Sequence, residues 1–185
     1  MGKVRAVCIS EKRGTQKKNV ESAVFVENWG IEGDAHAGNW HRQISLLSEE
    51  TIAAFKARGA EVTDGAFGEN LVVSGYDFTK FPIGTRFMCK DVVLELTQIG
   101  KECHHGCEIF QKMGECIMPT NGVFAKVLHG GKISVGDEFH VQYRAAVITL
   151  SDTASKGERE DASGAAVEEI VRKEGYEVVL KKIIP

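Results

Sequence analysis

Short apolar runs, several of them alternating with polar residues, recur through the first three-quarters of the sequence and are separated by glycines. Alternation with a period of two places apolar side chains on one face of a strand, so these runs predict a sheet. Their number and spacing are typical of a β-barrel or a β-sandwich. The predicted strands cover residues 4–9, 23–26, 43–47, 70–73, 85–89, 92–97 and 138–143.

Two helices are predicted between these strands. The first follows Ser48, which suits an N-cap position, and ends by Gly59. Glu49 and Glu50 lie in its first turn, where negative charge favours the helix. The apolar residues of 123–128 predict the second helix.

The pattern changes towards the C-terminus. Residues 145–150 are nearly all apolar, as in strands that are buried on both faces of a parallel sheet. Helical spacing of apolar residues over 163–173 and a further strand over 176–184 complete a β-loop-α-β unit. We therefore expect a mainly β fold with a barrel and a few helices over 1–142, followed by an incomplete α/β segment over 145–185.

An incomplete α/β segment leaves strand edges unpaired, and unpaired edges favour pairing with another chain. We therefore expect self-association through the residues after Arg144, which would make the chain a homo-oligomer.

Composition narrows the classes of partner and compartment. The 185 residues include 26 acidic and 23 basic side chains, which give a net charge of −3, so no nucleic-acid partner is expected. No run approaches the roughly 18 apolar residues of a membrane span, so no membrane partner is expected. The N-terminus lacks the apolar core of a signal peptide, which indicates a cytoplasmic protein.

Reactive side chains are densest in residues 98–107. A thiol attacks, or binds a soft metal, as the thiolate, which nearby positive charge favours. Lys101 and His104 flank Cys103, and Cys107 directly precedes a short predicted helix. Both cysteines are therefore candidates for an activated thiol.

Three alternatives to an activated thiol stay open. Cys and His could hold zinc, although the Cys-x3-Cys spacing lacks the paired knuckles of common structural sites. Cysteines could simply be buried, which is the interpretation favoured for Cys8 and Cys89 and one of two for Cys116. A Cys-His-acid hydrolase triad is the third alternative.

The segment 30–43 gathers glycines and ionisable side chains into one loop. Gly33 can free backbone amides, and His36 and Arg42 can donate hydrogen bonds to an anion such as phosphate. The alternative is a hairpin loop in which Asp34 caps a turn.

A second polar group stands at residues 65–71. Its glycines permit close backbone approach, while Glu69 and Asn70 supply an acceptor and an amide at the start of a strand. Turn formation explains the same residues nearly as well.

The ordered set of motifs resembles the MOSC domain, which molybdenum cofactor sulfurases share with molybdenum-dependent amidoxime-reducing proteins. The resemblance covers about residues 1–142. The matching residues are Gly33-Asp34-Ala35-His36, Arg42, Gly68-Glu69-Asn70-Leu71, Gly100-Lys101-Glu102-Cys103 and Gly136-Asp137.

The resemblance implies binding of molybdopterin, or sulfur carried on a cysteine; pyridoxal phosphate binding is a further family-level association. Cys103 corresponds to the family cysteine, which would carry sulfur or ligate molybdenum. Cys107, Cys116 and His104 are secondary candidates. The implied cofactor-binding residues are Gly33, Asp34, His36, Arg42, Glu69, Asn70 and Lys101.

Residues 145–164 resemble the start of the molybdopterin adenylyltransferase domain, on Ser151-Asp152-Thr153-Ala154-Ser155 and Asp161 to Gly164. The leading hypothesis is therefore a molybdenum cofactor-handling protein with molybdopterin or a sulfur donor protein as its partner. Its activity would be that of a sulfur carrier, a transferase or a component of a molybdenum-dependent reductase. The alternatives are a non-catalytic cofactor chaperone and a zinc-stabilised structural domain.

Overall fold

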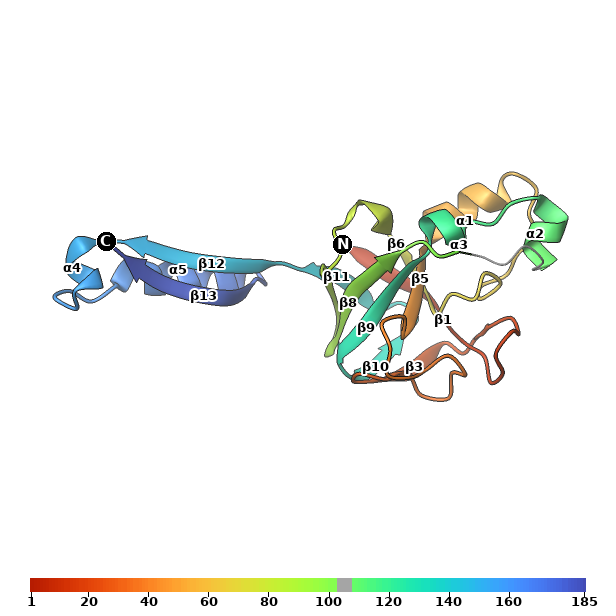
Figure 1. Ribbon diagram of the computed structural model, residues 1–185, viewed down its shortest axis with the longest axis horizontal. Coiled ribbons are helices and arrows are strands. Elements are labelled where there is room, and N and C mark those ends of the chain that lie inside the picture. The colour runs from red at the N-terminus through yellow and green to blue at the C-terminus, as the bar shows by residue number, and fades with distance from the viewer. Residues whose placement is uncertain (103–107) are drawn as a thin grey trace. The chain divides into compact units, whose positions relative to one another are not determined.

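The computed structural model describes residues 1–102 and 108–185. The chain divides into two compact units, Met1–Val141 and Gln142–Pro185 (Figure 1).

A closed barrel of seven strands forms the first unit. The order around it is β11-β7-β8-β9-β5-β6-β1, and β1 also pairs with β11, which closes the sheet. The pair β5–β6 is parallel and β1–β6, β5–β9, β7–β8 and β8–β9 are antiparallel. The predicted mainly β barrel is thus confirmed. Its strands are β1 (Gly2–Ile9), β5 (Ile44–Ser48), β6 (Leu71–Ser74), β7 (Arg86–Cys89), β8 (Val92–Ile99), β9 (Val123–His129) and β11 (Glu138–Gln142).

Smaller strands extend the barrel. The short strand β2 (Lys18–Asn19) pairs with the end of β1. A separate three-stranded sheet has the order β10-β3-β4. Its strands are β3 (Ser22–Val26), β4 (Gly30–Ile31) and β10 (Gly131–Ser134).

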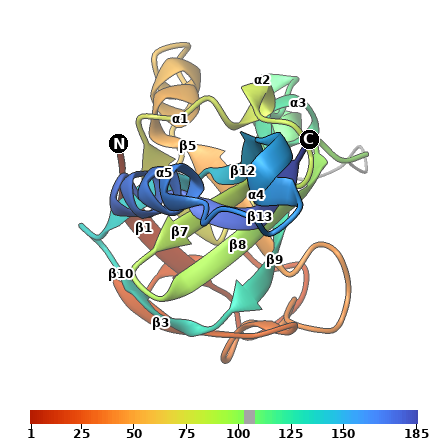
Figure 2. The same cartoon turned by 90° about the vertical axis from the view of Figure 1, so that its left-hand side faces the viewer.

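The helices of this unit gather on one side of the barrel (Figures 1 and 2). They are α1 (Glu49–Lys56), α2 (Glu108–Met113) and α3 (Met118–Asn121); a 3-10 turn, η1 (Phe78–Lys80), lies elsewhere in the sequence. The Ser48 side chain accepts a hydrogen bond from the backbone N–H of Thr51, so the predicted N-cap of α1 is confirmed.

The helix predicted over 123–128 is wrong, because these residues form the strand β9. This strand lies between β5 and β8, and Val123, Ala125 and Val127 are buried in the barrel. A short apolar run without clear alternation fits a buried strand as well as a helix. Here the pairing partners on both sides decide the conformation.

Aromatic rings fill one part of the barrel interior. Phe87 packs edge-to-face against Phe78 at 5.3 Å between ring centroids and stacks on Phe139 at 5.4 Å. The predicted burial of Cys8 and Cys89 is confirmed, and burial raises the pKa of each thiol to about 12. These two thiols are therefore packing residues, as the sequence indicates.

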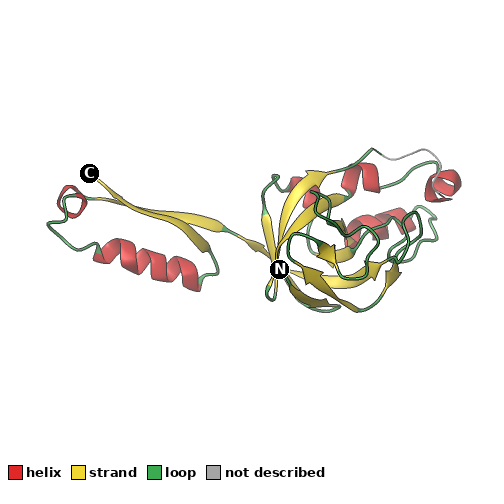
Figure 3. Ribbon diagram, turned by 60° about the horizontal axis from the view of Figure 1, so that its bottom comes forward, coloured by secondary structure: helices red, strands yellow, loops and turns green. Residues whose placement is uncertain are grey.

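The second unit is a β-loop-α-β arrangement. Its strands β12 (Arg144–Leu150) and β13 (Glu177–Ile184) are parallel, as predicted. The short helix α4 (Asp152–Ser155) follows β12, and α5 (Ala162–Lys173) lies along the two-stranded sheet (Figure 3).

Burial of β12 on both faces is not observed. Ile148 is half exposed and Leu150 is 74% exposed. In this unit β12 pairs only with β13 and is covered by one helix, so three of its five apolar side chains, Ala146, Ile148 and Leu150, stay exposed. The expected self-association through this unit stays a prediction. No helix of the described residues is long and apolar enough to cross a membrane.

The aromatic packing gives a first test of the barrel. Phe87→Ala should lower the free energy of unfolding by about 3–5 kcal/mol, because the loss of a fully buried ring leaves a cavity among Phe78 and Phe139. Urea unfolding measures the change. Val24→Ala, at an exposed position of β3, is the matched control and should change it by less than about 1 kcal/mol. Equal effects of the two changes would contradict this account of the core.

Candidate functional site

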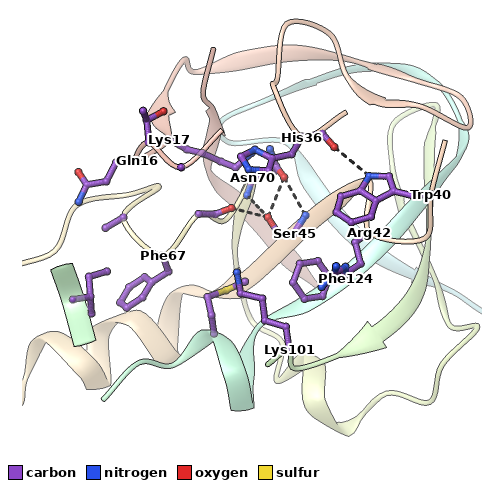
Figure 4. A pocket seen from close by; sticks show the side chains of 16 residues that line it. Gln16, Lys17, His36, Trp40, Arg42, Ser45, Phe67, Asn70, Lys101 and Phe124 are labelled. Carbon is purple, nitrogen blue, oxygen red and sulfur yellow. Dashed lines mark hydrogen bonds between the residues drawn. The ribbon is translucent and has the colours of Figure 1, made fainter. Parts of the chain in front are cut away.

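A cavity of about 620 Å³ opens where loops of the first unit converge near the helices (Figure 4). Its walls come from the loops that follow β1, β4, α1 and β8, together with side chains of β5, β9, α2 and α3. The lining residues are Gly14, Thr15, Gln16, Lys17, His36, Trp40, Arg42, Ser45, Ala66, Phe67, Gly68, Asn70, Lys101, Ile109, Met118 and Phe124.

A buried ion pair forms one wall of this pocket. Lys17 Nζ lies 2.7 and 2.6 Å from the two carboxylate oxygens of Asp34, and the side chains are 2% and 0% exposed. The Ser10 backbone N–H and Asn70 Nδ2 also donate to Asp34, at 3.0 and 3.1 Å. Burial acts to raise the pKa of Asp34, but these four hydrogen bonds hold it below its ordinary value. Burial lowers the pKa of Lys17, and its contact with Asp34 acts against that shift. The two short hydrogen bonds from Nζ to the Asp34 oxygens fit a pair of carboxylate and ammonium.

Asn70 connects this ion pair to the barrel. Its Oδ1 accepts hydrogen bonds from the backbone N–H and the hydroxyl of Ser45, at 3.1 and 3.0 Å. Its Nδ2 donates to the Cys8 carbonyl oxygen at 3.0 Å as well as to Asp34. One amide thus ties β1, β5 and the loop of Asp34 together, so the position of the ion pair is set by the barrel.

Glu69 holds the loop that carries Phe67 into the pocket. Its carboxylate oxygens accept hydrogen bonds from the backbone N–H groups of Gly65 at 2.7 Å and Phe67 at 3.0 Å. Gly65 has φ +87°, and a Cβ there would collide with the Lys17 carbonyl oxygen, so only glycine suits this turn. Burial raises the pKa of Glu69 to about 7.

Arg42 lies between two aromatic rings at another side of the pocket. The carbon of its guanidinium is 4.9 Å from the centre of the Trp40 ring and 5.6 Å from that of Phe124, within cation–π range. Arg42 Nε is buried and no described residue accepts its hydrogen bond. A buried donor without a partner is costly, which points to a ligand that supplies the acceptor.

The charged side chains that line the pocket are all positive. Lys17, Arg42 and Lys101 line it, and no acidic residue of the described chain does. Because Asp34 neutralises Lys17 from behind, Arg42 and Lys101 carry the net positive charge of the pocket. Such a surface attracts a phosphate or another oxyanion.

The structure divides the residues predicted from sequence into two groups. His36, Arg42, Asn70 and Lys101 line the pocket. Asp34 and Glu69 lie behind its walls, where they hold Lys17 and the Phe67 loop, and Gly33 is not among the lining residues. Both acids thus hold parts of the pocket wall in place, and contact of Gly33, Asp34 and Glu69 with a ligand stays a prediction.

Of the three cysteines predicted to be reactive, the structure describes Cys116. Cys103, Cys107 and His104 lie outside the described residues. Cys116 is half-buried and does not line the pocket. Within residues 1–102 and 108–185, no three His, Cys, Asp or Glu side chains come together as a metal-ligand set.

Three side chains that line the pocket were not found from the sequence. Lys17 stands in a polar loop with nothing to mark it, and only tertiary contact with Asp34 distinguishes it from Lys18. Trp40 and Phe124 flank Arg42 from different segments. The neighbouring Trp40 and Arg42 in one glycine-rich loop were the one available signal.

The ion pair predicts an asymmetric effect on stability. Lys17→Met should lower the free energy of unfolding by about 3–5 kcal/mol, because it leaves the Asp34 carboxylate buried without its counter-charge. Lys17→Met combined with Asp34→Asn should recover part of this loss. Arg5→Met breaks the exposed Arg5–Glu49 pair and serves as the control, with an effect under about 1 kcal/mol. Urea unfolding of the four proteins tests this.

Glu69 predicts how stability changes with pH. Its pKa in the folded protein, about 7, exceeds the ordinary 4.5, so the folded state binds the proton more tightly. The raised pKa of Glu69 adds about 3 kcal/mol to the free energy of unfolding below pH 4.5. This contribution is lost as the pH rises to about 7. Relative to Glu69→Gln, the wild type should therefore lose stability between about pH 5 and pH 7.5 in urea titrations. A constant difference would contradict the raised pKa.

Comparison with known proteins gives a family match and several similar solved structures. The sequence model of the MOSC domain matches residues 33–140. No curated protein matches the sequence. The crystal structure of the YuaD protein from Bacillus subtilis has a TM-score of 0.64 at 23% identity, over 76% of this chain and 96% of that one.

Two YiiM crystal structures share the fold. That from Geobacillus stearothermophilus gives a TM-score of 0.59 at 18% identity, over 76% of this chain and 75% of that one. That from Escherichia coli gives 0.51 at 15%, over 94% and 92%. At these identities the likeness concerns the fold alone, whereas the sequence match spans more than half of the 185 residues. The chain therefore belongs to the MOSC domain family.

Proposed function

We propose that this chain binds molybdopterin in the pocket and handles the molybdenum cofactor there. The observation that carries the proposal is the unpartnered Arg42 Nε, buried beside a pocket whose charged lining residues are all basic. The MOSC family is linked to the handling and sulfuration of this cofactor, so the expected ligand is anionic and carries a phosphate.

The pocket residues fit such a ligand by charge and by size. Arg42 and Lys101 would hold the phosphate, and a volume of about 620 Å³ lies within the range of small-molecule sites. Trp40 and Phe124 fix the guanidinium of Arg42 before the ligand arrives, which reduces the entropy lost on binding. When bound, the cofactor supplies a molybdenum centre that can be sulfurated or reduced.

Cys103 is the proposed thiolate of this site. In the sequence it follows Lys101, which lines the pocket, by two residues. Thiolates are soft ligands and strong nucleophiles, which suits both ligation of molybdenum and transport of sulfur. Cys107 and Cys116 are the proposed substitutes.

The sequence of the second unit also resembles that of a protein that acts on molybdopterin. Its segment 145–164 resembles the start of the molybdopterin adenylyltransferase domain, whereas the MOSC match ends at residue 140. We propose a related origin for this unit and assign no adenylyl transfer to it.

Binding of purified molybdopterin tests the proposal. Arg42→Met should weaken binding by ten- to a hundredfold, because a charged hydrogen bond contributes about 1.5–3 kcal/mol. Lys132→Met is the matched control, since it removes an exposed lysine on β10 away from the pocket lining, and its affinity should stay at the wild-type level. Fluorescence titration measures all three affinities. Equal loss in both variants would indicate unspecific attraction and overturn the site.

Cys103→Ser separates the thiolate from the chaperone alternative. A ligating or sulfur-carrying Cys103 predicts loss of molybdenum retention in the variant and a mass increase on the wild-type thiol after incubation with a persulfide donor. A chaperone that only shields molybdopterin predicts unchanged affinity and no modification. Elemental analysis and peptide mass spectrometry distinguish these outcomes.

A further inference from the structure

His36 joins the buried ion pair to the pocket. Its Nδ1 lies 3.4 Å from Lys17 Nζ and 3.9 Å from the nearer carboxylate oxygen of Asp34. The imidazole is 36% exposed and lines the pocket beside Lys17 and Asn70 (Figure 4). One side of the ring therefore meets a fixed charge, and the other is available to a ligand.

The ammonium of Lys17 decides which nitrogen of His36 carries the proton. An ammonium has three N–H donors and no lone pair. Two of them are used by the Asp34 oxygens at 2.6 and 2.7 Å, and among the described residues the side-chain acceptor left for the third is His36 Nδ1, at 3.4 Å. Since Nδ1 must accept, a neutral His36 carries its proton on Nε2.

The surrounding charges keep His36 neutral. Burial lowers its pKa, and the positive charges of Lys17, Arg13 and Lys101 lower it further, while Asp34 alone raises it. Arg13 is held nearby, because its Nε donates to the Ala35 carbonyl oxygen at 3.1 Å. A proton on Nδ1 would also face the ammonium of Lys17 directly, which Coulomb repulsion opposes.

We propose that His36 is the neutral hydrogen-bond donor of the pocket, which presents Nε2–H to an oxygen of the bound anion. This inference deepens the proposed function and depends on it for the ligand, but the state of His36 can be measured without any ligand. The anion would receive its positive charge from Arg42 and Lys101 and a directed, uncharged hydrogen bond from His36. Binding of the anion to the pocket would then not require a protonated imidazole.

Two other histidines provide references within the same chain. His129 Nδ1 lies 2.7 Å from the Asp91 carbonyl oxygen, which only accepts, so His129 carries its proton on Nδ1. His41 Nε2 lies 2.9 Å from Gln98 Oε1, while Gln98 Nε2 donates to the Gly100 carbonyl oxygen. His41 therefore carries its proton on Nε2, as His36 does in this proposal.

Long-range proton–nitrogen NMR of the full chain labelled with 15N-histidine identifies each tautomer. His36 should show the pattern of protonated Nε2 and a pKa below 6.5, and His129 the opposite tautomer. His36 with its proton on Nδ1, or as an imidazolium at pH 7, would overturn the proposal.

Inorganic sulfate is the ligand probe, because its charge stays constant around and above pH 7. On titration with sulfate the Nε2 signal of His36 and the Nε signal of Arg42 should shift with one binding constant. A response of Arg42 without His36 overturns the donor role and leaves the proposed function intact. No response of either overturns the anion site of the proposed function together with the donor role.

Two substitutions of His36 test the position of the donor. Glutamine places an N–H near the position of Nε2, so His36→Gln should keep sulfate affinity within about threefold, whereas His36→Ala should lose about tenfold. The ratio of wild-type to His36→Gln affinity should be the same at about pH 7 and pH 8.5, because the pKa of His36 lies below its ordinary 6.5. A ratio that rises tenfold at the lower pH would show that an imidazolium binds the anion, against the proposal.

Discussion

The pocket depends on one buried carboxylate. Asp34 is fully enclosed and accepts hydrogen bonds from Lys17, Ser10 and Asn70, so it fixes segments that come from three parts of the sequence. Removing an ion pair from water costs several kcal/mol, and such a cost is met only when the remaining hydrogen-bonding groups are satisfied. The hydrogen bonds from Lys17, Ser10 and Asn70 meet that condition for Asp34. The charged and polar side chains of this wall therefore take their positions from a residue that does not itself line the pocket.

The division of labour between acids and bases follows from that arrangement. Asp34 and Glu69 lie under the pocket surface, where they orient a lysine and a loop, while Arg42 and Lys101 line the pocket. Negative charge is thus kept in the supporting layer and positive charge at the surface. A chain with a net charge of −3 thus has a pocket whose charged lining residues, among those the structure describes, are all basic.

The sequence predicts the strands well because alternation and glycine spacing are local signals. It fails at residues 123–128, where burial between two strands overrides an ambiguous apolar run. In the site, glycine and ionisable residues marked the loop of His36 and Arg42, but nothing local marked Lys17. Its role comes from contact with Asp34, seventeen residues away, and only the fold establishes such a contact. The supporting positions of Asp34 and Glu69 likewise come from tertiary contacts that only the fold establishes.

Closure of the barrel has a consequence for how the unit is made. Gly2 and Lys3 pair with Phe139 and Glu138, so the first strand of the unit finds its last neighbour about 136 residues later. During synthesis on the ribosome β1 must therefore wait with one edge open until β11 has emerged. The segments that hold Asp34 are present long before that moment, but the sheet that supports them is complete only after it. Until then the open edge of β1 can pair with a strand of another chain, which is a route to aggregation.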